Sequence, residues 1–184
     1  MVSISSSFHT AVFDALCACL NLSPHSREAI ALIHEAYAEP ENTPRPPRSR
    51  NVIYWTLIRD YASDQVSTVC NAEGSGRAHT PVVYTTLKYQ LIIVCYGPAC
   101  EEYAQRIRAL LYLDGPGFPR RIFREAGIYP IPDPPQPVVF HEEEGSLWRK
   151  RADLTISLRV RDEREGQERG SIMTAPAVII RKGN

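Results

Sequence analysis

Hydrophobic and polar positions alternate most regularly in the middle of the chain. Five residues recur there at every second position: Leu87, Tyr89, Leu91, Ile93 and Cys95. This period places them on one face of a pleated strand. The opposite face begins polar and ends apolar at Ile92 and Val94. The pattern predicts a strand that is half-exposed at its first end and buried on both faces at its second end.

The dipeptide Gly97-Pro98 ends this alternation. Glycine suits the N-cap of a helix and proline suits the first helical position, so we expect a helix to begin here. The apolar residues that follow are spaced as one helical stripe: Cys100, Tyr103, Ile107, Leu110 and Leu111. The product is a long strand, a tight turn and an amphipathic helix that folds back on the sheet. Leu91 and Ile107 are expected to be core residues on these facing elements.

Other stretches give weaker signals of the same kinds. A second apolar stripe predicts a helix over Phe8–Leu20, and the run from Arg27 to Ala38 fits either a helix or a short strand. A short helical segment is expected at 119–126. Strands are expected at 51–59, 138–141, 147–161 and 172–181, with an acidic turn at Glu142–Glu144. This order predicts an α+β fold with a mostly antiparallel β-sheet and two main helices packed on one face.

The length of 184 residues fits a single domain over residues 1–184. Two stretches depart from regular structure. Residues 39–50 are rich in proline and arginine and form a predicted arm, because proline cannot pair regularly in a sheet. Residues 60–80 are polar and contain Gly74-Ser75-Gly76, which predicts an exposed hairpin tip or an insertion between two long strands.

The 21 basic and 21 acidic residues cancel. This balance argues against nucleic acid or an anionic membrane as the main partner. No apolar run approaches the roughly 20 residues of a membrane span, and the first residues do not resemble a secretory signal. The five cysteines are scattered without a C-x-x-C pair, so we interpret them as reduced, mostly buried thiols of a cytosolic protein.

No catalytic, cofactor or metal signature is found in the sequence. The five histidines share no ligand spacing with each other or with cysteine. His141 beside three glutamates fits a solvated acidic turn better than a metal site. Cys100 near a helix N-terminus would favour its thiolate, but it falls on the apolar stripe and is expected to be buried and inert.

Charged residues gather in groups of mixed sign. A solvated face is the simplest interpretation, and pairing between subunits is the sharper one, because such charges set the register of an interface. The candidate interface residues are Arg45, Arg48, Arg50, Glu142, Glu143, Glu144, Trp148, Arg149, Arg151, Arg161 and Arg164. Trp148 is the one large aromatic residue in a highly charged stretch, and it could equally serve as a core tryptophan of its own subunit.

Four stretches, in this order, together resemble the phage neck and tail terminator family, whose members complete the tail and join it to the head. They are TPRPPRSRNVIYWTLI, LKYQLIIVCYGPACEEYAQRIRALL, REAGIYPIPDPP and EEGSLWRKRADLTISLRV, and they span about residues 43–160. The resemblance implies a structural virion protein without enzymatic activity or cofactor. It also implies a ring, commonly a hexamer, that contacts itself, the tail tube protein and head-tail connector proteins. DNA would pass through its lumen without specific binding, and assembly would take place in the host cytoplasm.

Two other classes of function are compatible with the sequence. One is a monomeric, non-enzymatic adaptor that binds another protein through its Pro-rich loops. The other is an enzyme with a dispersed site that uses Cys100 or His141. The mass in solution separates a ring from a monomeric adaptor, and alanine substitutions at Cys100 and His141 test the enzyme.

Overall fold

The computed structural model describes residues 6–36, 47–69, 82–115, 117–144 and 147–165. The elements are α1 (Ser6–Cys19), α2 (Arg27–Leu32), β1 (Ile33–Glu35), β2 (Val52–Val69), β3 (Val82–Tyr96), α3 (Cys100–Tyr112), α4 (Arg120–Glu125), β4 (Ile128–Pro130), β5 (Val138–Glu144) and β6 (Leu147–Glu165). The predicted fold class is confirmed: a mostly antiparallel six-stranded sheet carries two long helices, α1 and α3, on one face.

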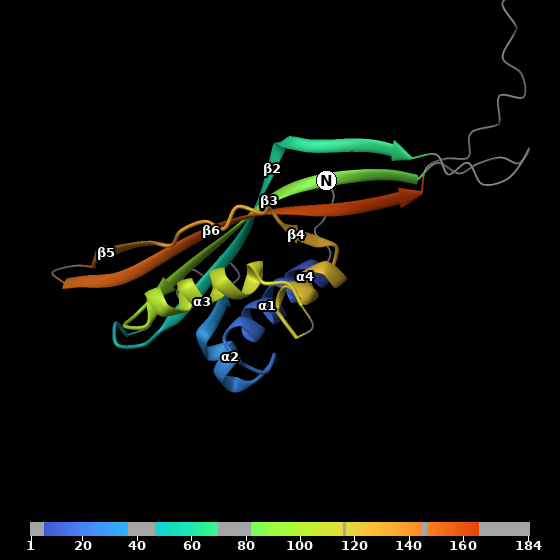
Figure 1. The fold of residues 1–184 in the computed structure, drawn as a ribbon. Coiled ribbons are helices and arrows are strands. Elements are labelled where there is room, and N and C mark those ends of the chain that lie inside the picture. The colour runs from blue at the N-terminus through green and yellow to red at the C-terminus, as the bar shows by residue number, and fades with distance from the viewer. Residues whose placement is uncertain (1–5, 37–46, 70–81, 116, 145–146, 166–184) are drawn as a thin grey trace, which may run out of the picture.

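Three long antiparallel strands, β2, β3 and β6, form the body of the sheet (Figure 1). The short strand β1 pairs with the outer edge of β2 and gives the only parallel pairing among the described strands. On the opposite edge, β6 pairs with β5 near its beginning and with β4 farther along. β2 bends where its register with β3 shifts, between Asp60 and Gln65.

The core lies between the sheet and the helices. The alternating residues of β3 from Leu87 to Cys95 are buried, and Leu154, Ile156 and Leu158 of β6 lie beside them. Leu91 and Ile107 are both fully buried in this core, as their spacing predicted. Ile92 and Val94 are only half-buried. The prediction that the second end of β3 is buried on both faces is therefore wrong, because the helices cover one face of the sheet only (Figure 1).

The turn between β3 and α3 differs from its prediction. Helix α3 begins at Cys100 with Ala99 as its N-cap, and Gly97 instead forms the turn with a φ of +104°. The side chain of Asn51 supplies the missing cap, since its Oδ1 accepts a hydrogen bond of 2.9 Å from the Ala99 N–H. The start of β2 is thus joined directly to the start of α3, which fixes the helix against the sheet.

The run from Arg27 to Ala38 was ambiguous because its described part contains a short helix and a short strand in succession. Ser26 caps α2 by accepting a hydrogen bond of 3.1 Å from the Ala29 N–H. At Ile33 the backbone becomes extended, with φ −113° and ψ 119°, and pairs with β2. The short helix and the short strand each offer too little periodicity to be recognised alone.

Several expected loops are strands. β2 continues to Val69, so the first part of the expected insertion, residues 60–69, is a strand. Residues 70–81 lie outside the described residues. The expected acidic turn, Glu142–Glu144, is the end of β5, and β6 continues to Glu165, beyond the expected strand end at residue 161. Pairing with a long neighbouring strand overrides the low strand propensity of these charged residues. The strand expected at 172–181 and most of the 39–50 arm also lie outside the described residues.

Candidate interface on the β5–β6 hairpin

Strands β5 and β6 form an antiparallel hairpin at one end of the sheet. Its register runs from Val138 opposite Asp153 to Glu144 opposite Leu147. We call residues 138–144 and 147–153 the hairpin arm. Its end reaches beyond α3 in Figure 1. Five large apolar residues of the arm are exposed: Val138, Val139, Phe140, Leu147 and Trp148. Exposed apolar side chains gathered on one element mark a surface that binds another molecule.

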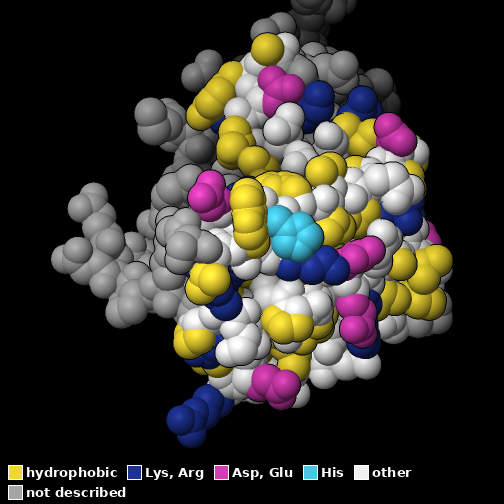
Figure 2. All heavy atoms as spheres, turned by 90° about the vertical axis from the view of Figure 1, so that its left-hand side faces the viewer, with side chains coloured by type: hydrophobic (Ala, Val, Ile, Leu, Met, Phe, Trp, Pro, Cys, Tyr) yellow, Lys and Arg dark blue, Asp and Glu magenta, His cyan; other side chains and the backbone are white. Residues whose placement is uncertain are grey.

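Alternation along β6 sends successive side chains of the arm to opposite faces of the sheet. Ala152 lies in the core, so Lys150 and Trp148 project toward the helix side. Lys150 confirms this direction, because its Nζ lies 3.0 Å from Glu101 of α3. Arg149 and Arg151 project from the other, open face. Figure 2 views the molecule from the arm end and shows hydrophobic, basic and acidic side chains intermixed on the surface at that end.

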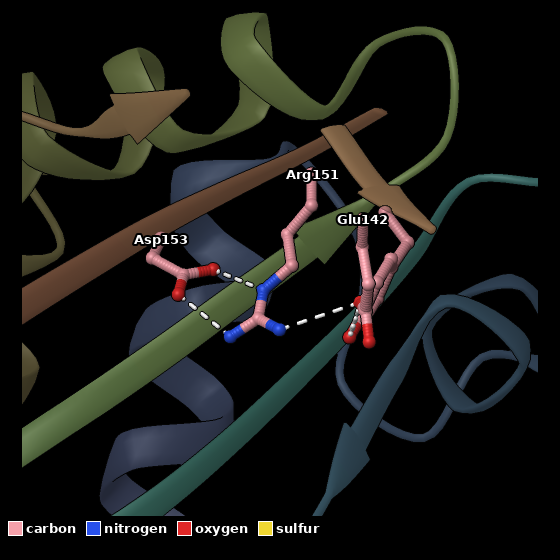
Figure 3. Close-up of polar contacts among 4 residues, drawn as sticks. Glu142, Arg151 and Asp153 are labelled. Atoms are coloured by element: carbon pink, nitrogen blue, oxygen red, sulfur yellow. Dashed lines mark hydrogen bonds and ion pairs between the residues drawn. The ribbon is translucent and has the colours of Figure 1, made fainter. Parts of the chain in front are cut away.

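Arg151 lies at the centre of a group of contacting side chains on this open face, which we call the open-face cluster (Figure 3). Its guanidinium makes two hydrogen bonds to the Asp153 carboxylate, of 2.6 and 2.7 Å, and a longer one of 3.4 Å to Glu142 of β5. Two parallel bonds to one carboxylate are the strongest geometry available to arginine. The hydrogen bonds to Asp153 raise the pKa of Arg151 above its already high ordinary value. Its charge therefore persists at any physiological pH, and its contacts link β6 to β5.

Tyr96, the last residue of β3, ties the arm to the centre of the sheet. Its hydroxyl donates a hydrogen bond of 2.9 Å to Glu142, and the Arg149 guanidinium lies 4.5 Å from its ring centroid. Burial and the hydrogen bond to Glu142 raise the pKa of Tyr96. Arg149 is only 6% exposed. The aromatic face that attracts this guanidinium also shields it from water. The arm is thus held to β3 by polar contacts, while its apolar tip stays exposed.

A protein-family model described as phage neck terminator protein matches residues 9–182. The chain belongs to this family. It is therefore a structural protein of the phage neck, as the four sequence stretches implied. No curated protein sequence matches the chain. Membership in this family of structural neck proteins implies a non-enzymatic role in the virion.

The structure of this chain brings together some of the expected interface residues. Glu142, Arg149 and Arg151 form one cluster with Tyr96. Glu143 and Trp148 lie opposite each other on the arm, and both are exposed. The 64% exposure of Trp148 excludes the alternative that it is a core tryptophan of its own subunit. Glu144 lies at the end of β5, and its side chain is outside the described part.

The remaining expected residues lie elsewhere on the neck terminator fold. Arg50 is exposed and donates a hydrogen bond of 2.9 Å to the Ala31 carbonyl, so this end of the arginine-rich segment lies against α2. Arg48 is half-buried, and Arg45 lies outside the described residues. Arg161 and Arg164 belong to the far end of β6, where Arg164 pairs in register with Val83. These two arginines are therefore not part of the hairpin cluster.

Sequence reasoning missed three residues of the open-face cluster. They are Asp153, Tyr96 and Phe140, which were not singled out as interface residues. The Arg151 guanidinium lies over the ring of Phe140, with its central carbon 4.9 Å from the ring centroid. A signal was available, because Tyr96 continues the second face of β3 by strict alternation, after Ile92 and Val94. The contact could not be read without the register that sets β5 and β6 beside β3.

Chemistry of other kinds has little support in the described part of the neck terminator chain. It holds no group of histidine, cysteine and carboxylate side chains that could bind a metal, and no helix within it is long and apolar enough to span a membrane. Four cysteines are buried and reduced: Cys17, Cys19, Cys95 and Cys100. Burial raises the pKa of Cys17 to about 11 and that of Cys19 to about 12, and it also raises that of Cys100. These thiols are poor nucleophiles at neutral pH.

Proposed function

We propose that this neck protein forms a closed ring, a hexamer, that caps the tail tube and joins the tail to the head. The single observation that carries the proposal is the family match over residues 9–182. The hairpin arm supports it physically. Trp148 and Leu147 are each more than half exposed on a protruding strand pair. Large apolar side chains exposed in this way are typical of surfaces that bind another protein.

The ring has three kinds of partner. Copies of the chain bind one another around the ring, the tail tube protein binds one face, and head-tail connector proteins bind the other. Two unlike faces require every copy to point the same way, so contacts between copies are heterologous and close by rotation. DNA passes through the lumen without specific binding. The zero net charge fits this role, because weak phosphate contacts do not hold the genome in place.

Removing the protein from an infection tests the assembly role. Particles made without it are expected to have tails of uncontrolled length, or tails that stay unattached to heads. Electron microscopy of the lysate gives both readouts, and a plasmid copy of the intact chain should restore normal particles. Heads joined to tails of normal length in the absence of the protein would contradict the terminator role and leave the monomeric adaptor in its place.

A further inference from the structure

The two outer edges of the sheet lie in register at the arm end of the molecule. One continuous row of paired residues crosses five strands, from Ile33 of β1 through Ile53, Cys95 and Ala152 to Val139 of β5. Among the described strands, β1 and β5 therefore form the two opposite edges of the sheet at this level. In a ring of heterologous contacts, each copy must present two different surfaces to its two neighbours. Opposite edges of one sheet meet this requirement.

The β5 edge carries a protruding apolar tip. Leu147 is 60% exposed and Trp148 is 64% exposed. Trp148 projects toward the helix side of the sheet, as Lys150 does. Large aromatic side chains of this kind dominate binding where they enter a pocket on a partner. We call Leu147 and Trp148 the tip.

The β1 edge carries a hollow on the same, helix side of the sheet. This cleft has a volume of about 330 Å³, which is at the lower end of the range for ligand pockets and is enough for one large side chain. It lies between α1 and the β1–β2 pair and is lined by His9, Thr10, Phe13, His25, Ile33, Glu35 and Trp55. Ile33 and Trp55 are buried and apolar. The His9 Nδ1 and Glu35 Oε1 atoms lie 2.6 Å apart, and these two side chains form the polar part of the lining.

Charges of opposite sign lie beside the tip and on the β1 edge. Glu143 is exposed directly opposite Trp148, whereas the nearby cations Lys150 and Arg151 are already paired with Glu101 and Asp153. On the other edge, Arg50 is held by the carbonyl of Ala31, two residues before β1. The tip therefore has an exposed carboxylate beside it, and the β1 edge has an exposed guanidinium near its beginning, outside the lining of the cleft. Within the cleft the Glu35 carboxylate is already paired with His9. The Arg50 guanidinium is therefore the group of opposite sign that Glu143 meets when the β5 edge of one copy meets the β1 edge of another.

We infer that the tip of one copy occupies the α1–β1 cleft of the next copy around the ring. This contact rests on the proposed ring and names its interface. Trp148 fills the apolar part of the cleft, and Glu143 approaches the arginines at 48–50. The tip and the cleft lie on opposite edges of one sheet, so a copy cannot fill its own cleft. Each contact leaves a free tip at one end of a growing chain until rotation closes the ring.

A disulfide between neighbours tests the contact in assembled particles. The double variant Glu143→Cys with Thr10→Cys joins the cross-strand neighbour of Trp148, which lies on the same face, to an exposed residue of the cleft lining. Mild oxidation of purified particles, followed by a non-reducing gel, is expected to give a ladder of covalent multimers of this chain. Either single variant and the unchanged chain control for reaction of native cysteines. Tyr129→Cys with Thr10→Cys is the matched geometric control, because Tyr129 is an exposed aromatic residue of β4.

A second variant reports the energy of the contact. Trp148→Ala should reduce incorporation into particles by roughly tenfold or more, as expected for a central aromatic anchor, with an unchanged circular dichroism spectrum. Tyr129→Ala should incorporate normally. Rings that are visible in particles but give no ladder, together with normal incorporation of Trp148→Ala, would overturn this contact and leave the ring intact. A cross-link to a different virion protein would also overturn it. Particles with no ring of this chain would instead refute the proposed function itself.

Discussion

Ile107→Ala is expected to lower the free energy of unfolding by about 2–5 kcal/mol. Ile107 of α3 and Leu91 of β3 are both fully buried in one core cluster, so removing either leaves a cavity between helix and sheet. Urea unfolding monitored by circular dichroism measures the loss, and Leu91→Ala should fall in the same range.

The matched control for this prediction is Ile30→Ala. Ile30 is an isoleucine of α2 that is 56% exposed, so its loss should change stability by about 0.5 kcal/mol or less. If both core variants also lost less than about 0.5 kcal/mol, the packing of α3 on β3 would be wrong.

Gly97→Ala is expected to cost about 3 kcal/mol or more. The φ of +104° strains any residue with a side chain. A Cβ at this position would also lie 2.6 Å from the Asn51 side-chain oxygen, 2.7 Å from the Arg50 carbonyl oxygen and 2.9 Å from the Asn51 Cα. Relieving these clashes displaces Asn51, which caps α3. Loss of such a cap alone costs about 0.5–2 kcal/mol.

Gly117→Ala separates the two causes. Gly117 also has a positive φ, of +90°, but a Cβ there would meet no atom within 4 Å. Its substitution should cost only the backbone strain, about 1–2 kcal/mol. The same urea measurement compares the two variants. Equal losses at both positions would mean that the close approach of Gly97 to Asn51 has no energetic consequence.

Periodicity predicted the parts of the fold in which one face is buried. The alternation from Leu87 to Cys95 and the stripe through Ile107 gave the central strand and helix, because burial against a core imposes a period on the sequence. Elements that depend on a neighbour were missed or shortened. β2 and β6 extend through polar and charged residues because β3 pairs with them along its length. The Asn51 cap joins positions 48 residues apart, which no local pattern reveals.

The sequence named charged residues for the candidate interface, but it did not predict how these residues are arranged. Arg149, Arg151 and Glu142 were expected as charges at an interface, yet Arg149 is buried over Tyr96 and Arg151 is paired with Asp153. Their charges hold the arm in place within one subunit. The exposed part is the apolar tip with Glu143. A charge count along the sequence cannot tell a charge that fixes a strand from a charge that faces a partner, because the pairing depends on strand register.

Direct imaging of the neck in intact particles tests the central claim most directly. Electron microscopy with symmetry analysis, on particles that carry a tagged copy of this chain, reports how many copies are present and where they lie. We predict a closed, rotationally symmetric ring of six copies at the head-proximal end of the tail tube, all pointing in the same direction. A single copy bound at the neck, or copies placed elsewhere on the particle, would contradict the account.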